Sequence, residues 1–573
     1  MAWIHESRNA NYDAAMKILA ALLAVSLCPA AIAQHAVQDK PVPRSQPRPS
    51  AATVAQWQDR KFGMFIHFGL YSEFGGVWQG KNIDNGLSEQ IMGNAPIPLD
   101  DYAAAAKTFN PTKWDPDAVV ALAKSAGMKY IVITTKHHDG FNMFHTAQTK
   151  YNIVDATPYH RDIVKELSEA CKRGGLGFGV YYSTIDWHEP GMDHYIEGNS
   201  NPITDAHARF NAAQLQELLS NYGPITEIWF DMGKPTPEQS NLFATTVHKL
   251  QPQTMVSGRV WNYQGDFTVM SDNEVPAYGI DEPWQTPASM FNETWGYRSW
   301  QKRDNVQGKI EENILKLVQV ASRGGNFILN IGPEGDGSIV PYEAEVLRGI
   351  GAWLKPNGEA IYGTKASPFS ALDFGYATLK GNAVYLFIKS APADGVLRLP
   401  HASHTDWSTA NVLSSGKALK IAKDEHSVSL QIPSGSLDGA MPVIKLTFRK
   451  TLAIDKPQPT LGVSASVLDE NNAEKFYNYN GRGYEAPKTI YKLRWPVQAG
   501  CASLTFHTSA AGEVALVSNG TARKIVVKDG STAEVVIGSG ETLEITPPQP
   551  FLKGTPLPFK VESIDLSPHT CSR

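Results

Sequence analysis

Cysteine is scarce in this sequence, with four residues among 573. A chain so poor in cysteine is not a disulfide-dense scaffold and must bury cores of its own. Neither sign of charge dominates: the formal net charge is only −5, which argues against a nucleic-acid or anionic-membrane binder. A phosphate-binding loop is also missing, because Gly324-Gly325 lacks the Lys and Ser/Thr of such a loop and no dinucleotide fingerprint follows a strand.

The N-terminus holds one apolar run. Lys17 precedes the run 18–27, and Ala31-Ile-Ala33 follows as a small-x-small cleavage site. The run is too short for a membrane anchor, which needs about 20 residues. We therefore predict a signal peptide over 1–33, with translation starting at Met1 or Met16, and export to the periplasm or the medium. Residues 34–51, rich in Gln, Pro and Ser, are predicted to form a linker.

The cysteines fit this organisation. Cys28 would leave with the signal peptide, and Cys171 falls on the core face of a predicted helix. Cys501 and Cys571 could pair across the C-terminal region if they lie close in space.

Short apolar runs that end in polar residues dominate the next part of the chain. They begin at Gly63, Tyr130, Gly177 and Glu227, and each is typical of a strand buried on both faces. Helical patterns lie between them, such as 115–127. This alternation predicts a (β/α)8-like TIM barrel over 52–362, with its site at the carboxyl ends of the strands. The last two barrel strands are expected within 289–297 and 326–333.

From about Gly363 the pattern changes to short alternating strands separated by turns. This predicts an antiparallel β-sandwich over 363–452, with strands near 383–388, 428–432 and 443–448. A Pro-containing link then leads to an accessory β-rich domain over 453–573.

Two groups of strand-end residues indicate chemistry. His137 and His138 leave a buried strand on opposite sides, and no further histidine stands at ligand spacing, so we expect no metal there. Hydrogen bonds to a polyhydroxylated ligand suit them better. Asp231 directly follows Ile-Trp-Phe, and an ionised carboxylate is costly there unless it has partners. Because Met-Gly-Lys-Pro-Thr-Pro delays the next helix, a nucleophile or general base explains Asp231 better than a helix cap does.

Five motifs, in this order, resemble the α-L-fucosidases of glycoside hydrolase family 29. They are Gly63-Met-Phe-Ile-His-Phe-Gly69, Lys136-His-His-Asp-Gly-Phe141, Gly179-Val-Tyr-Tyr-Ser183, Trp229-Phe-Asp231 and Gly324-Gly-Asn326 with Asn330-Ile-Gly-Pro333. The resemblance covers about residues 52–450. It implies an exo-acting retaining hydrolase for terminal α-L-fucosyl residues of glycans, without a cofactor.

The resemblance also implies roles for residues at matching positions. Asp231 would be the nucleophile, and Trp295 would form an apolar wall for the methyl group of the sugar. Gln90 stands where the family has Trp after the glutamate. The implied substrate-binding set is His67, Glu89, His137, His138, Tyr182 (chosen over Tyr181 on the motif), Trp229, Arg259 and Trp295.

The acid/base is implied less directly, because the family places it in variable loops. Glu274 falls in a segment that resembles the one carrying this role, and we predict it here. Many members also have a Trp-Glu pair before the last strands, where this chain has Trp284-Gln285. Glu282 is the second candidate and Glu293 the third. Aromatic residues in the irregular stretch 261–284 favour a branched-glycan substrate.

Three other interpretations stay open at this point. The chain could be a barrel glycosidase for another sugar, although such an enzyme would not be expected to carry the Lys136–Gly140 cluster. It could be a catalytically dead fucose-binding protein, which any turnover of a fucoside would exclude. It could be a metal-dependent hydrolase, which insensitivity to a chelator would exclude.

Overall fold

The computed structural model describes residues 42–573 except 190–194, 277–279, 281, 370–371, 426, 434–436, 438, 455–465, 470–472, 479–488, 498–499, 519–520, 539–541, 548–556 and 571–573. The predicted signal peptide, Cys28 and Cys571 lie outside these ranges. Within them, no helix has both the length and the apolar character needed to cross a membrane.

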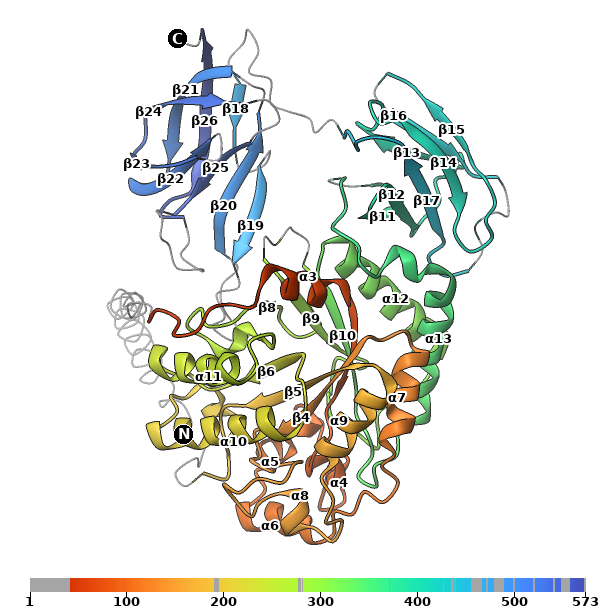
Figure 1. Cartoon of the computed structure of the whole chain (residues 1–573), viewed down its shortest axis with the longest axis vertical. Coiled ribbons are helices and arrows are strands. Elements are labelled where there is room, and N and C mark those ends of the chain that lie inside the picture. The colour runs from red at the N-terminus through yellow and green to blue at the C-terminus, as the bar shows by residue number, and fades with distance from the viewer. Residues whose placement is uncertain are drawn as a thin grey trace, which may run out of the picture. The chain divides into compact units, whose positions relative to one another are not determined.

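A single parallel sheet of eight strands forms the first part of the chain (Figure 1). Its order is β7-β6-β5-β4-β1-β10-β9-β8, and an isolated parallel bridge between Ser257 and Phe267 links the ends that follow β7 and precede β8. The sheet therefore curls into the predicted (β/α)8-like barrel, and this prediction is confirmed. The strands are β1 (Phe62–Ile66), β4 (Tyr130–Lys136), β5 (Gly177–Ser183), β6 (Glu227–Asp231), β7 (Met255–Val256), β8 (Thr268–Val269), β9 (Trp284–Ser289) and β10 (Asn326–Ile331).

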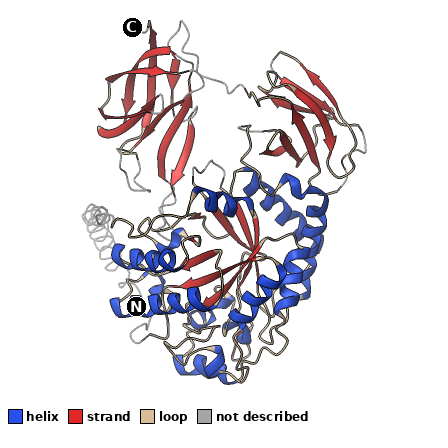
Figure 2. Cartoon of the chain, in the orientation of Figure 1, coloured by secondary structure: helices blue, strands red, loops and turns tan. Residues whose placement is uncertain are grey.

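Helices cover the outside of this sheet (Figure 2). Their ends follow local chemistry: Asp115 caps α7 by accepting a hydrogen bond from Ala118 N at 3.0 Å, Pro116 occupies the first turn, and Gly127 follows the helix at φ +85°. The longer helices are α3 (Ala51–Asp59), α6 (Leu99–Ala104), α7 (Pro116–Ser125), α9 (Ile163–Gly174), α10 (Asp205–Asn221), α11 (Pro237–Leu250), α12 (Val306–Ser322) and α13 (Pro341–Asn357). Short elements between them are α4 (Tyr71–Phe74), α5 (Ile91–Asn94), α8 (Ile153–Ala156), the hairpin β2 (Val77–Trp78) and β3 (Lys81–Asn82), and the 3-10 turns η1 (Ser88–Gln90), η2 (Ala105–Lys107), η3 (Glu197–Ser200), η4 (Gly258–Val260) and η5 (Gly358–Ala360).

One strand prediction is wrong. We expected a strand within 289–297, but β9 ends at Ser289, and the next residues form turns. Strand β9 pairs in parallel with β10 from Gln285 to Ser289 and includes Pro287. Polar residues and a proline hide this strand in the sequence, because its pairing rather than its own propensity fixes it.

The barrel interior is filled by large side chains, mostly aromatic, rather than by a channel. They run from α3 to the strand ends and form one buried cluster: Trp57, Phe65, Tyr130, Val132, Tyr181, Trp229, Met255, Phe267, Val269, Trp295 and Ile328.

Antiparallel sheets make up the rest of the chain, as predicted. One pair has the orders β11-β12-β17-β14 and β13-β16-β15, and the other has β18-β26-β21-β24 and β19-β20-β25-β22-β23. The first pair comprises β11 (Gly375–Lys380), β12 (Ala383–Ile388), β13 (Val396–Pro400), β14 (Trp407–Val412), β15 (Lys420–Lys423), β16 (Ser427–Gln431) and β17 (Val443–Phe448). The second comprises β18 (Ser466–Leu468), β19 (Glu474–Asn478), β20 (Thr489–Pro496), β21 (Gly500–Thr508), β22 (Gly512–Ser518), β23 (Thr521–Val527), β24 (Ser531–Ile537), β25 (Thr542–Thr546) and β26 (Val561–His569). The domain boundaries given above stay predictions.

Part of the predicted linker makes specific contacts with the barrel. Arg44 lies 3.0 Å from the buried carboxylate of Asp266 and 3.0 Å from His248 Nδ1. Ser45 donates a hydrogen bond to Asn241 at 2.7 Å. Residues 44–45 therefore bind to the α11 side of the barrel.

Candidate active site

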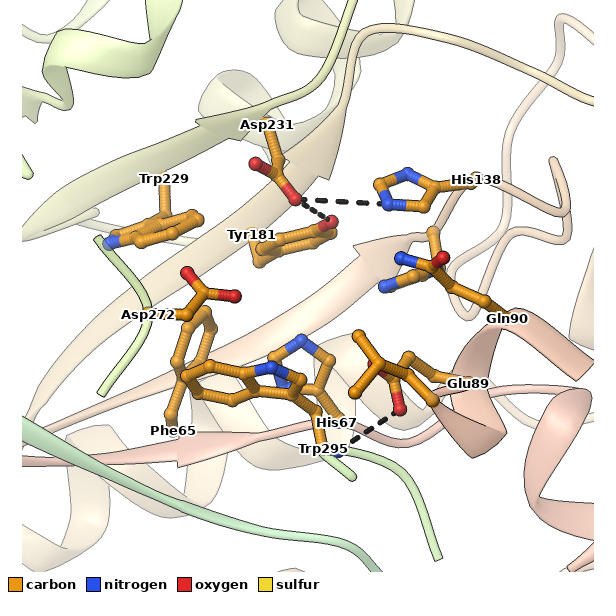
Figure 3. Close-up of a pocket in the computed structure, with 12 residues that line it drawn as sticks. Phe65, His67, Glu89, Gln90, His138, Tyr181, Trp229, Asp231, Asp272 and Trp295 are labelled. Atoms are coloured by element: carbon orange, nitrogen blue, oxygen red, sulfur yellow. Dashed lines mark hydrogen bonds and ion pairs between the residues drawn. The ribbon is translucent and has the colours of Figure 1, made fainter. Parts of the chain in front are cut away.

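A pocket with an empty volume of about 280 Å³ opens where the barrel strands end (Figure 3). The lining side chains are Phe65, His67, Leu87, Glu89, Gln90, His137, His138, Tyr181, Trp229, Asp231, Asp272 and Trp295.

Asp231, the last residue of β6, is almost fully buried and has strong partners. Its Oδ2 accepts a hydrogen bond from the Tyr181 hydroxyl at 2.7 Å and lies 3.9 Å from His138 Nε2, and its Oδ1 accepts from Arg259 at 2.9 Å. Burial alone would raise the pKa of Asp231, but the Arg259 charge, His138 and the Tyr181 hydrogen bond outweigh it and lower the pKa. The carboxylate is therefore ionised at neutral pH with one face toward the pocket, as a nucleophile requires.

Two histidines beside Asp231 are neutral. Burial lowers the pKa of both His67 and His138 to about 4, although Asn330 and Asp231 respectively act in the opposite direction. His67 Nδ1 is 2.7 Å from Asn330 Oδ1, and His138 Nδ1 is 2.8 Å from Ser183 Oγ. These contacts fix the orientation of each ring, so that each can offer its other nitrogen to a ligand.

His137 provides a polar atom without a partner. Its ring stacks on Tyr181 with centroids 5.4 Å apart, and its Nδ1 is buried without a hydrogen bond among the described residues. Buried polar atoms are normally paired. An unpaired nitrogen in a pocket wall is suited to a ligand hydroxyl.

Glu89 lines the opposite side of the pocket. Its Oε2 accepts hydrogen bonds from the backbone N–H groups of Trp295, at 3.0 Å, and Gly296, at 2.8 Å. Burial raises the pKa of Glu89 to about 7 in spite of these bonds. The same contacts hold the Trp295 backbone, and the indole of Trp295 forms an apolar part of the wall.

Arg259 connects two carboxylates. Besides Asp231, it donates to Asp272 Oδ1 at 2.7 Å, and its guanidinium lies 4.5 Å from the centre of the Trp229 ring. Asp272 lines the pocket, and Figure 3 places it on the same side as Trp229. Asp272 was not among the residues predicted for the site; its loop position gave no signal of this proximity.

The prediction that Tyr182 binds the substrate is corrected by the structure. The Tyr182 hydroxyl oxygen lies 2.7 Å from Asn211 Oδ1 and 2.6 Å from Gln214 Oε1 on α10, so the side chain is on the outer face of β5. Side chains alternate along a strand, and Tyr181 therefore faces the barrel interior. Tyr181, not Tyr182, is the tyrosine that lines the pocket.

None of the three predicted acid/base candidates lines the pocket in the structure. Glu274 Oε2 accepts from Ser271 N at 3.3 Å, Glu282 accepts from the Thr268 hydroxyl, and Glu293 is exposed. Gln285, where the resemblance implies a glutamate, is fully buried inside the barrel. An acid at position 285 would therefore not reach a pocket ligand.

The other predicted residues come together. Asp231, His67, Glu89, His137, His138, Trp229 and Trp295 line one pocket, and Arg259 contacts Asp231 directly. Among the described residues, no group of three or more His, Cys, Asp or Glu side chains is arranged to hold a metal ion.

Comparison with known proteins gives a consistent result. Residues 30–359 match the family model for α-L-fucosidase. The tissue α-L-fucosidase of Bos taurus is 31% identical over 432 residues, covering 71% of this chain and 90% of that protein, and the enzyme of Rattus norvegicus is 32% identical over 434 residues. The crystal structure of α-L-fucosidase from Vibrio sp. strain EJY3 covers 91% of this chain and 99% of its own, with a TM-score of 0.66 and 28% identity. A GH29 enzyme from Bacteroides thetaiotaomicron, trapped as a covalent intermediate with 2-fluoro-fucosyl fluoride, has a TM-score of 0.63 and 26% identity over 71% of this chain and 100% of its own. The chain therefore belongs to the α-L-fucosidase family of glycoside hydrolases.

Proposed function

We propose that this protein is an exported, retaining exo-α-L-fucosidase with Asp231 as its nucleophile. The observation that carries the proposal is the ionised Asp231 carboxylate, held by Arg259 and Tyr181 in a pocket of about 280 Å³. The family gives the sugar bound in this pocket as fucose. The substrate is a fucosylated glycan.

The neutral histidines support binding of an uncharged, hydroxyl-rich ligand. His67, His137 and His138 each have a nitrogen available for a sugar hydroxyl, and Glu89 provides a strong acceptor. Trp295 offers an apolar surface for the methyl group of fucose. Trp229 and Arg259 form the wall next to Asp231.

In the first step, Asp231 attacks the anomeric carbon while a second carboxyl group protonates the leaving oxygen. In the second step, that group takes a proton from water, and the water attacks the glycosyl-enzyme. The relative trapped with 2-fluoro-fucosyl fluoride supports such a covalent intermediate here. The ionised state of Asp231 is the state needed for attack.

The second carboxyl group comes from the segment 272–274. Glu274 is the residue assigned by sequence, while Asp272 is the one whose carboxylate lines the pocket. The acid has to reach the glycosidic oxygen, and this favours Asp272. Asp272 contacts Arg259 at 2.7 Å in the structure, so substrate binding has to release this contact before Asp272 can protonate the leaving oxygen.

Export is supported by two features of the chain. The N-terminal segment has the charge, apolar run and cleavage site of a signal peptide ending at Ala33. Cys501 is disulfide-bonded, which suits an oxidising compartment, and its suggested partner Cys571 lies outside the described residues. N-terminal sequencing of protein from the periplasm or medium should begin at Gln34; retention of residues 1–33 in a cytoplasmic fraction would contradict export.

The activity is tested with 4-nitrophenyl α-L-fucoside and with the matching α-galactoside and β-hexosaminide. Turnover of the fucoside alone is expected, with α-fucose as the first anomer seen by NMR. Preference for another sugar would support the glycosidase alternative. Binding of fucose without turnover would support the dead-enzyme alternative.

A further inference from the structure

Gln285 has all its polar atoms engaged in the barrel interior. Its Oε1 accepts a hydrogen bond from Trp229 Nε1 at 2.8 Å. Its Nε2 donates to Glu227 Oε1 at 3.0 Å and lies 3.0 Å from the Tyr130 hydroxyl oxygen. The residue is completely buried, so water could not take the place of a lost partner.

Glu227 anchors the other end of this arrangement. Its Oε2 accepts from Trp57 Nε1 at 2.5 Å, so each carboxylate oxygen has an N–H donor. Donors on both oxygens stabilise the charged form, although burial raises the pKa of Glu227 to about 7. Glu227 and Trp229 are two residues apart on β6 and so point to the same face.

The Trp229 indole connects Gln285 to the reacting carboxylate. One face of the ring lies 4.5 Å from the Arg259 guanidinium, and the ring stacks with Tyr181 at 5.7 Å. Arg259 and Tyr181 both bind Asp231. A rotation of the indole would therefore disturb both groups that hold the nucleophile.

Only a side chain with both a donor and an acceptor fits between Trp229 and Glu227. A glutamate at 285 would bring its carboxyl to about 3 Å from that of Glu227, and the pair would have a donor for this contact only while it holds one shared proton, which it loses as pH rises. A leucine would leave Trp229 and Glu227 without partners in a dry core. The amide of Gln285 satisfies both.

We propose that Gln285 is a positioning residue that fixes the Trp229 indole against Arg259 by tying it to the buried Glu227. The inference rests on the proposed function, since its effect is on the attack by Asp231.

Four variants test it: Gln285→Glu, Glu227→Gln, the exchanged pair Glu227→Gln/Gln285→Glu, and Gln239→Glu. Gln239, a buried glutamine in the capping box of α11, is the control for a stability loss away from the pocket. The readouts are kcat and KM for an aryl fucoside from pH 5 to 8.5, with the thermal midpoint of each variant. Turnover by the wild type is measured first, because its absence would refute the proposed function and not this inference.

Gln285→Glu should lose about 10-fold or more in kcat at pH 8 and recover toward low pH as the two carboxyls share a proton. The exchanged pair should return to within about 3-fold of wild type across the range, because Trp57, Trp229 and Tyr130 again have acceptors. In Glu227→Gln, the amide oxygen replaces only one of the two acceptor oxygens of the carboxylate. We expect this variant to lose less kcat than Gln285→Glu. Gln239→Glu should lower the thermal midpoint with kcat unchanged.

Two results would overturn the inference. One is wild-type kcat at pH 8 for a folded Gln285→Glu. The other is an exchanged pair that has the wild-type thermal midpoint but no recovery of kcat. If Gln285→Glu alone fails to fold, the exchanged pair still tests the inference, because its amide and carboxylate again pair each donor with an acceptor.

Discussion

The carboxylate of Asp231 lies 2.9 Å from the guanidinium of Arg259, and both are almost completely buried. An aspartate at this depth is stable as an anion only with such a partner. The same arginine reaches Asp272 across the pocket edge at 2.7 Å. Arg259 therefore contacts both carboxylates on its side of the site and lowers the pKa of Asp231.

Replacing Arg259 with glutamine should move the acidic limb of the pH–kcat/KM profile upward by about one pH unit or more. The nucleophile must be ionised, and removing the positive charge raises the pKa of Asp231 above its present lowered value. Arg173→Gln, in an exposed ion pair with Asp117, is the control and should leave the profile unchanged. An acidic limb that does not move in Arg259→Gln would show that Asp231 does not set it.

The neighbouring tyrosines of β5 should separate catalysis from stability. Tyr181→Phe removes the hydrogen bond to Asp231 and should lower kcat by roughly 10- to 100-fold, the value of a bond to a charged group. Tyr182→Phe leaves Gln214 Oε1 without its donor, while Asn211 Oδ1 keeps Lys136, and should cost about 1–3 kcal/mol of unfolding free energy with little change in kcat. Kinetics and urea unfolding of both variants check this. The reverse pattern would return Tyr182 to the site.

Asp272→Asn and Glu274→Gln should differ in how their rates depend on the leaving group of the substrate. Loss of the acid/base should slow an aryl fucoside with a poor leaving group far more than one with a good leaving group, and azide should restore turnover as fucosyl azide. We expect this behaviour for Asp272. If only Glu274→Gln shows it, the sequence assignment is right, and the loop must rearrange when substrate binds.

Burial of Glu343 should make the protein less stable as pH rises. Its Oε2 accepts from Gly332 N at 3.1 Å, but burial raises its pKa to about 8. The folded protein then binds this proton more tightly than the unfolded chain, so its contribution is complete below about pH 4.3 and is lost as pH rises toward 8. Glu343→Gln should therefore gain roughly 1–4 kcal/mol relative to wild type between pH 5 and 8. The exposed Glu345→Gln is the control; parallel pH curves for Glu343→Gln and wild type would contradict the prediction.

A chelator should not change the activity. Among the described residues, no group of three or more His, Cys, Asp or Glu side chains is arranged to hold a metal ion, and His138 Nδ1 is engaged by Ser183. Rates measured after dialysis against EDTA, with and without added Zn²⁺, should agree. A loss that Zn²⁺ restores would support the metal-dependent alternative.

The barrel and the strand-end residues of the pocket could be predicted because their signals are local, whereas Glu89, Trp229 and Trp295 were implied only by the resemblance to a family. Buried strands that end in His67, His138 or Asp231 combine an apolar run with a costly polar group. The choice between Tyr181 and Tyr182 could not be made in this way, since β5 is buried on both faces and its sequence does not alternate. In the structure, Tyr181 and Ser183 share a face of β5, where Tyr181 contacts Asp231 and Ser183 contacts His138.

Contacts between distant segments could not be predicted. Asp272 joins the pocket through Arg259, 13 positions away along an irregular loop, and Gln285 reaches Trp229 and Glu227 across the barrel. Strand β9 lies in a polar, proline-containing segment and is fixed by pairing with β10. Such features follow from the closed sheet and not from neighbours in sequence.

The central claim is that Asp231 forms the covalent bond to fucose, and labelling with 2-fluoro-fucosyl fluoride tests it most directly. We predict a stable adduct of one fluorofucosyl group per chain in the intact mass, on the peptide that contains Asp231. An Asp231→Asn variant should remain unlabelled with its thermal midpoint preserved. Attachment of the label to another residue, such as Glu89 or Asp272, would contradict the account. Full labelling of Asp231→Asn would contradict it as well.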